Sequence, residues 1–407
     1  MVTIQDVDAL QILDSRGNPT VRVRLSSQNH TVAANVPSGA STGSHEAHEL
    51  RDNTEAYNGK GVSKACQHIR REIKKHVQGK TYKSQQAFDQ DLIELDGTKN
   101  KERLGANALL GCSMAFSKLH AKAQGLHTHQ VFGDTTTIPT PYCNIINGGD
   151  HAGNALTMQE FMIVPQQFET FHGKTRAATE VYHELKHLIE QKYGPDATSV
   201  GDEGGFAPPI QNARDALDLV EKAISNKGYT EKISLAMDPA ATEFYDEDKG
   251  YNVDGEWMSP DDLVTYYEKL IADYPITSLE DPFHEEDFER FAQLRSSVKD
   301  ACQIVGDDLT VSNTERVQKA AKHGSVNALL LKVNQIGTVT EAIQAATLSQ
   351  QKGWNVMVSH RSGETEDPFI MDLAVGINAS QVKIGAPARG ERTAKYNRLL
   401  EIEHLHK

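Results

Sequence analysis

The sequence predicts an α/β protein in two parts, a small N-terminal α+β domain followed by a larger (β/α)8 barrel. The chain has 407 residues, more than one domain of about 150 residues requires. An alternating strand pattern and a helical pattern occupy its first part. Short apolar runs and amphipathic helical patterns then alternate over the rest, which is about as long as a (β/α)8 barrel.

The predicted N-terminal α+β domain spans residues 1–133. Val21, Val23 and Leu25 alternate with arginines, and this period of two is typical of a half-buried strand. Residues 31–36 predict a returning strand, and apolar positions at helical spacing within 106–121 predict a helix. We therefore expect a small sheet followed by helices.

The predicted barrel spans residues 134–407. Its candidate strands are the apolar runs 233–237, 276–279, 304–305, 328–331 and 356–358, with Val382 in a last short strand. Amphipathic helical patterns, such as 178–189 and 213–224, lie between runs. Nearly continuous apolar strands that alternate with helices indicate parallel strands covered by helices.

Composition excludes several classes of protein. The net charge of −14 argues against nucleic acid or an anionic membrane as the main partner. No apolar run approaches the ~18–20 residues of a membrane helix, and the first residues lack a signal-peptide pattern. The cysteines are scattered without a C-x-x-C pair, which argues against a cysteine zinc site and a disulfide framework. We expect a cytoplasmic protein.

An ionisable residue closes or follows each of the six candidate strands. These residues are Asp238, Glu280, Asp307, Lys332, His360 and Lys383. Strands often end in polar residues, but two lysines after apolar runs are costly unless they are paired or used. Successive barrel strands would direct all six groups to the C-terminal mouth, where barrel enzymes keep their active sites.

The residue types at this mouth indicate a metal-assisted proton abstraction. Asp238, Glu280 and Asp307 form an all-oxygen set, which favours Mg²⁺ and would repel itself without a cation. A lysine beside a divalent cation is pushed toward its neutral form and can accept a proton. The combination predicts removal of a proton next to a carboxylate, with the metal stabilising the enediolate.

Two further carboxylates and one loop are candidate parts of this site. Glu160 lies in a polar context and Glu203 lies between glycines that would let the backbone approach a ligand closely. Such a carboxyl pair can hold one proton and act as a general acid opposite the lysine, although Glu203 also fits a solvated turn. Residues 37–43 fit either a lid or an ordinary hairpin loop.

These motifs together resemble the enolase family, the 2-phospho-D-glycerate hydro-lyases of glycolysis. The matching segments are SRGNPTV (15–21), PSGASTG (37–43), LGANA (104–108), NGGDHAGN (147–154), MQEFM (158–162), GDEGG (201–205), LEDPF (279–283), DDLTV (307–311), LLLKVNQIG (329–337), VSHRSGETED (358–367) and KIGAPAR (383–389). They span almost the whole chain in order. The resemblance implies a TIM-type barrel with irregular first strands, and a Lys base with Mg²⁺ is known chemistry of the enolase superfamily.

The resemblance also implies a role for each matched site residue. Lys332 would be the base at C2, and Glu203, assisted by Glu160, would protonate the departing C3 hydroxyl. Two Mg²⁺ ions are implied, the first on Asp238, Glu280 and Asp307, the second reached by Ser41 from its loop. The implied substrate-binding residues are His151, Gln159, His360, Arg361, Ser362 and Lys383. A homodimer or a larger homo-oligomer is implied as well.

Three alternatives stay open on the sequence alone. One is a paralogue that acts on a related phosphonate or phosphorylated hydroxy acid. Another is a zinc metallopeptidase, because His183, Glu184 and His187 form an H-E-x-x-H motif, although its apolar stripe turns both histidines toward solvent. The third is a binding protein that has kept the fold and lost catalysis.

Overall fold

The N-terminal region forms an antiparallel sheet in the computed structural model, which describes residues 1–40 and 43–406. The sheet order is β2 (Asp6–Leu13), β3 (Pro19–Ser26) and β4 (Thr31–Asn35). Val21, Val23 and Leu25 are fully buried on one face of β3. The predicted strand and its returning partner are therefore confirmed, because the period of two places one face against a core.

Helices cover the buried face of this sheet. The predicted helix is α4 (Ala106–Ala123), and it lies close to β3 because Gly111 has no side chain. A Cβ added at Gly111 would lie only 2.5 Å from Val23 Cγ2. The remaining elements of the region are β1 (Val2–Thr3), η1 (Ala56–Gly59), α1 (Ser63–His68), η2 (Ile69–Ile73), α2 (Lys74–Val77), β5 (Thr81–Tyr82), α3 (Gln85–Asp96) and η3 (Thr128–Val131).

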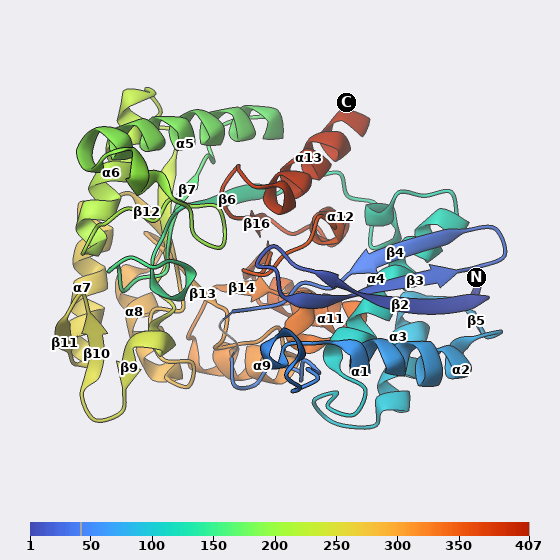
Figure 1. The fold of residues 1–407 in the computed structure, drawn as a ribbon. Coiled ribbons are helices and arrows are strands. Elements are labelled where there is room, and N and C mark those ends of the chain that lie inside the picture. Colours follow the sequence, from blue (N-terminus) through green and yellow to red (C-terminus); the bar gives the residue numbers. More distant parts are fainter. Residues whose placement is uncertain (41–42, 407) are drawn as a thin grey trace.

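The second region is a closed barrel of eight strands (Figure 1). Around the barrel the order is β12 (Ile276–Glu280), β13 (Gln303–Gly306), β14 (Ala328–Leu331), β15 (Asn355–Ser359), β16 (Gln381–Lys383), β6 (Thr140–Asn147), β7 (Glu160–Val164) and β8 (Ser234–Asp238). β7 is antiparallel to both of its neighbours, and the other pairs are parallel. The predicted fold class, including irregular first strands, is confirmed.

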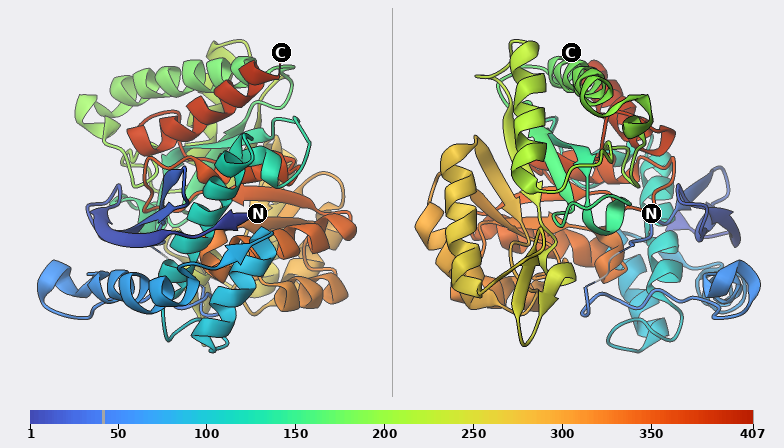
Figure 2. Two further views of the ribbon diagram at one scale, coloured as in Figure 1. Left: turned by 90° about the vertical axis from the view of Figure 1, so that its right-hand side faces the viewer. Right: turned by 60° about the vertical axis from the view of Figure 1, so that its left-hand side comes forward.

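Helices surround the barrel, and the N-terminal region packs at one side of it (Figure 2). The helices are α5 (Phe171–Tyr193), α6 (Ala213–Asn226), α7 (Pro260–Asp273), α8 (Phe288–Val298), α9 (Thr314–His323), α10 (Val333–Ile336), α11 (Val339–Gln351), α12 (Phe369–Gly376) and α13 (Gly390–Leu405). Short elements complete the region: η4 (Gly149–His151), η5 (Pro195–Thr198), η6 (Ala241–Phe244), β9 (Tyr245–Asp246), β10 (Gly250–Val253) and β11 (Glu256–Met258). Within residues 1–40 and 43–406, none of the helices combines the length and apolar character that crossing a membrane requires.

Alternation along each strand decides which side chains enter the barrel. On β14, Ala328 and Leu330 lie in a small inner core, whereas Leu329 and Leu331 belong to the larger core that the surrounding helices share. The next inward position is Lys332, at the mouth. The same alternation leads from Ala236 to Asp238 on β8, from Val305 to Asp307 beyond β13, and from Met162 to Glu160 on the reversed β7.

Polar contacts hold the N-terminal region against the barrel near this mouth. Ser38 and Gly363 exchange two backbone hydrogen bonds of 2.8 and 2.9 Å. Lys118 on α4 forms an ion pair of 2.6 Å with Asp367. These contacts bring the loop that begins at Pro37 to the rim of the barrel.

Candidate active site

The barrel brings the strand-end residues together at one mouth. A single cavity is lined by eleven predicted residues: His151, Gln159, Glu160, Glu203, Asp238, Asp307, Lys332, His360, Arg361, Ser362 and Lys383. Glu280 does not line the cavity itself, but its carboxylate contacts the ammonium of Lys383. The sequence prediction of one convergent site is therefore consistent with the structure.

Lys383 lies at the centre of a buried carboxylate cluster. Its Nζ is 2.8 Å from Asp238 Oδ2, 2.9 Å from Glu280 Oε1 and 3.0 Å from Glu160 Oε1. Burial alone would lower the pKa of Lys383, but the surrounding carboxylates raise it well above the ordinary lysine value. Burial and the neighbouring Asp238 raise the pKa of Glu280 well above its ordinary value. Three carboxylates therefore face one lysine, and the raised pKa of Glu280 shows that the cluster resists full ionisation in the absence of another cation.

The donor set fits a hard divalent cation. Glu280 Oε2 is buried and has no hydrogen-bond partner among the described residues. Asp281, Asp307 and Asp308 each present a carboxylate oxygen within 4.8 Å of the others. Asp281 also accepts hydrogen bonds from the backbone N–H groups of Asp307 and Asp308, at 2.9 and 2.7 Å. Oxygen-only ligation of this kind is typical of Mg²⁺ or Ca²⁺ sites.

Asp281 and Asp308 have no assigned role in the sequence prediction. A signal for them was present, because each directly follows a predicted metal ligand within the segments 279–283 and 307–311.

Lys332 is paired with a predicted metal ligand. Its Nζ donates to Asp307 Oδ2, and Gln335 Nε2 donates to Asp307 Oδ1 at 2.7 Å. Burial would lower the pKa of Lys332, but the charges of Asp307, Asp308 and Glu280 together outweigh burial and raise it. These carboxylates, with Asp307 first among them, therefore favour the charged form of the amine.

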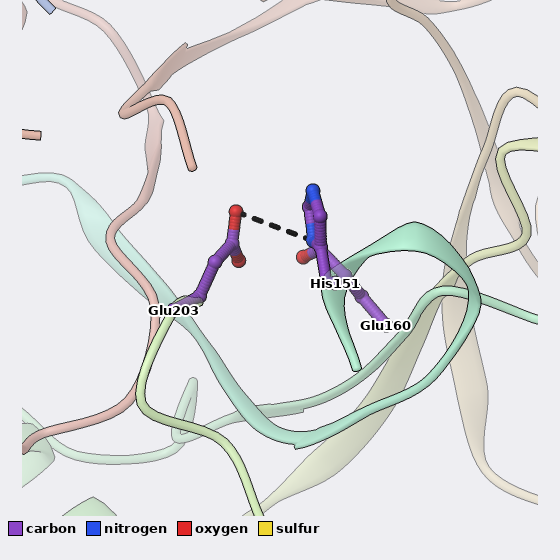
Figure 3. A group of neighbouring side chains, drawn as sticks. All are labelled: His151, Glu160 and Glu203. Atoms are coloured by element: carbon purple, nitrogen blue, oxygen red, sulfur yellow. Dashed lines mark ion pairs between the residues drawn. The ribbon is translucent and has the colours of Figure 1, made fainter. Parts of the chain in front are cut away.

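Glu160 and Glu203 face one another beside His151 (Figure 3). Glu160 begins β7, Glu203 lies in the loop 201–206, and His151 ends η4. His151 Nδ1 lies 3.6 Å from a carboxylate oxygen of Glu160 and 3.6 Å from one of Glu203. Burial and the charge of Glu203 raise the pKa of Glu160 well above its ordinary value. The pKa of Glu203 lies well below its ordinary value, because contacts with His360 and His151 outweigh burial. These opposite directions favour Glu160 as the member of the pair that keeps a shared proton.

The glycines around Glu203 allow neighbouring loops of the site to approach one another closely. A Cβ at Gly201 would lie 2.4 Å from the carbonyl oxygen of His151, and one at Gly205 would lie 2.6 Å from Asn147 Oδ1. The close approach predicted from these glycines therefore involves neighbouring loops of the protein. It fixes the position of Glu203, whose Oε2 accepts a hydrogen bond of 3.0 Å from Asn144.

The loop from the N-terminal region reaches Arg361 and Ser362. Ser362 Oγ accepts a hydrogen bond of 2.7 Å from the backbone N–H of Ala40. Both terminal nitrogens of Arg361 lie 3.1 Å from carboxylate oxygens of Glu46, and both side chains are almost fully buried. The predicted metal residue Ser41 lies outside the described residues.

Two residues at this mouth escape sequence reasoning. Glu46 lies 315 positions from its partner Arg361, so no local pattern connects them. Arg392 is fully buried on α13, and its Nη1 lies 2.6 Å from His360 Nδ1. The helical periodicity of 390–405 places Arg392 on the apolar side of the helix. That periodicity was the one sequence signal that could have predicted a buried arginine here.

The H-E-x-x-H residues lie apart from this mouth, on the outer surface of α5. His183 and His187 are exposed, and Glu184 forms an ion pair of 3.0 Å with Lys227. Neither group of described residues that could hold a metal ion includes His183 or His187. The geometry gives no support to a zinc peptidase.

Comparison with known proteins gives consistent matches over both regions. Residues 4–132 match the family model "Enolase, N-terminal domain", and residues 135–406 match "Enolase, C-terminal TIM barrel domain". The enolase of Methanopyrus kandleri is 52% identical over 409 residues, which cover 99% of this chain and 96% of that protein. The enolase of Methanococcoides burtonii is 53% identical, over 98% of this chain and 95% of its own. The enolase of Thermococcus kodakarensis is 50% identical, over 98% and 94%.

Proposed function

The chain belongs to the enolase family of phosphopyruvate hydratases, which are carbon–oxygen lyases, and we propose how its residues perform that reaction. The substrate is 2-phospho-D-glycerate and the product is phosphoenolpyruvate, in glycolysis and gluconeogenesis. Lys332 accepts the proton of C2, and the carboxyl pair of Glu160 and Glu203 delivers a proton to the hydroxyl that leaves C3 as water.

One observation carries this assignment, namely the positions of the base and the acid around the barrel. Lys332 follows β14 and Glu160 begins β7, and these strands lie four places apart in either direction around the eight-stranded barrel. A substrate at the centre of the mouth therefore has the amine on one side and the carboxyl pair on the other. This is the geometry of an elimination in which the proton and the hydroxyl depart from opposite faces.

The electron and proton balance follows from these positions. The C2–H electron pair enters the substrate carboxylate as an enediolate and then forms the C2–C3 double bond as water leaves. The reaction requires Glu160 to hold a proton beforehand, and the raised pKa of Glu160 supports that requirement. Glu203 then acts as the group that passes this proton to the leaving oxygen.

Asp238, Glu280 and Asp307 would hold a divalent cation, proposed to be Mg²⁺, with a second Mg²⁺ reached by Ser41. When bound, the cation supplies positive charge that stabilises the enediolate. Engagement of Asp307 as a ligand would weaken its pairing with Lys332, and the amine could then lose its proton. Arg361, Ser362, His151, Gln159, His360 and Lys383 are proposed to bind the phosphate and carboxylate of the substrate.

A direct assay tests this function. Addition of 2-phosphoglycerate and Mg²⁺ should raise absorbance at the enolpyruvate band, and chelation of the metal should abolish the signal. A phosphonate analogue of the substrate should react more slowly. If the folded, metal-replete protein acts on the analogue alone, the assignment of substrate is wrong.

We also propose a domain boundary, an oligomeric state and a cellular location. We place the domain boundary at residues 133/134, which the family-model ranges 4–132 and 135–406 support. A homodimer or larger homo-oligomer and a cytoplasmic location are proposed from the family, and four free buried cysteines are consistent with a reducing compartment. Light scattering of the purified protein tests the oligomeric state.

A further inference from the structure

Two histidines meet at the end of α13, among residues that the active site does not use. His129 lies in η3, and His406 directly follows α13, whose end is marked C in Figure 1. The Nε2 atoms of the two rings lie 3.1 Å apart. Nitrogens that each lie about 2.0–2.1 Å from one ion are separated by about 2.8–3.4 Å, for angles between right and tetrahedral. The observed separation falls within that range.

The surroundings of His129 favour the tautomer that a metal ligand needs. Its side chain is buried, and its Nδ1 has no hydrogen-bond partner among the described residues. Asp372 Oδ1 lies 3.6 Å from this Nδ1, and that carboxylate is held on α12 by hydrogen bonds of 2.9 and 2.6 Å from Arg398. A proton on Nδ1 faces this carboxylate, so the lone pair of Nε2 points toward His406. Carboxylate, histidine and metal form such a series in many metal sites.

We propose that His129 and His406 bind one divalent first-row transition-metal ion, of the Zn²⁺ class, at a site separate from the barrel mouth. Imidazole nitrogen suits this class of ion, whereas the oxygen donors of the mouth suit Mg²⁺. Water completes the coordination, because His406 is exposed. The ion joins η3 to the C-terminal end of α13 and so fixes the last turn of that helix.

The test is calorimetric titration of Zn²⁺ into untagged full-length protein in saturating Mg²⁺. The wild type should bind one equivalent more than His406→Gln, or bind it at least about 10-fold more tightly. His404→Gln is the matched control, because His404 is exposed on the same helix and should leave binding unchanged. Equal binding by wild type and His406→Gln would overturn the proposal and leave an N–H···N hydrogen bond between the rings.

A spectroscopic measurement distinguishes this site from binding of the probe at the mouth. Cu²⁺ bound to the wild type should show nitrogen superhyperfine splitting from two imidazoles in its electron paramagnetic resonance spectrum. The splitting should be reduced in His406→Gln and retained in His404→Gln. Circular dichroism and unchanged enolase activity establish that each variant is folded. A spectrum with oxygen ligands alone in the wild type would contradict the site.

Discussion

The same strands form both ends of the barrel, but the polar side chains at the two ends differ in charge and in hydrogen bonding. At the N-terminal end of the strands, Gln303 donates to Ser278 Oγ at 2.9 Å and to Gln381 Oε1 at 3.0 Å, and it accepts from Asn355 at 2.9 Å. This network is neutral. Among the described residues it contains no buried side-chain polar atom that lacks a hydrogen-bond partner.

The mouth at the other end is charged and incompletely paired. Every second residue of a strand points into the barrel, so the inward series that starts at Gln303 reaches Asp307 at the mouth. The series that starts at Gln381 reaches Lys383 in the same way. Buried atoms of Glu160, Glu280 and His151 lack hydrogen-bond partners among the described residues. The difference shows that one end of each strand contributes stability, whereas the other end keeps charge and hydrogen-bonding capacity for a ligand.

The largest expected effect is the loss of the base at the mouth. Lys332→Ala should lower kcat by about 10³–10⁴-fold, because Lys383, the other lysine that lines the cavity, is held among three carboxylates. The measurement is phosphoenolpyruvate formation by a variant shown to be folded. Lys101→Met is the matched control, since Lys101 is also buried and ion-paired, with Glu341 at 3.0 Å, but lies away from the mouth. Lys101→Met should lower the free energy of unfolding and leave kcat within about twofold of the wild-type value. Activity of Lys332→Ala near that of the control would remove the proposed base.

Loss of the acid should be smaller and should separate two partial reactions. Glu203→Gln should slow dehydration by about 10²–10³-fold, while exchange of the C2 proton with solvent, which depends on Lys332, should change far less. Nuclear magnetic resonance in deuterated water follows the exchange, and absorbance follows dehydration. Equal losses in both reactions would mean that the acid and the base are misassigned.

At the opposite end, disruption should affect stability and leave catalysis intact. Gln303→Leu removes the centre of the neutral network and leaves several partners unsatisfied, so the free energy of unfolding should fall by about 1–3 kcal/mol. Ser380→Ala, which removes one exposed hydrogen bond to Asn355, is the control and should have almost no effect. Denaturant unfolding measures both variants. A fall in kcat for Gln303→Leu with no change in stability would break the contrast between the two ends.

The smallest effect should be a gain in stability at the mouth. Glu280 has a pKa raised above its ordinary 4.5 in the folded protein, so the folded state holds this proton more tightly than the unfolded state. Metal-free wild type therefore loses stability as pH rises above about 4.5, and Glu280→Gln should escape that loss. At pH ~8 the variant should be more stable by about 1–2 kcal/mol in chelator, with the difference shrinking toward acid pH. A destabilised variant under these conditions would show that the mouth is already well compensated without metal.

Much of this arrangement follows from sequence because alternation along a strand is a local property. The pattern that buries Ala328 and Leu330 also directs Lys332 to the mouth, and the same holds for Asp238. The direction of β7 is harder to predict, because an apolar run has no polarity. The connection 148–159 gives a signal for this direction, because it has only twelve residues and several glycines, whereas the crossover between parallel strands usually contains an α-helix.

Contacts between distant segments set the limit of sequence reasoning. The pairing of Glu46 with Arg361 and the position of Arg392 behind His360 depend on how the N-terminal region and α13 dock on the barrel. Which of the two carboxyls holds the proton depends on the full set of buried neighbours of Glu160 and Glu203, and no spacing in the chain encodes that set.

The reach of the N-terminal loop over the barrel has a consequence for how this protein can evolve. The backbone N–H of Ala40 donates to Ser362, and the carboxylate of Glu46 pairs with Arg361, so the N-terminal region holds two residues that line the barrel cavity. Recombination near residue 133 would separate these contacting partners. We therefore expect a hybrid of two relatives to function only where both parents share this docking contact.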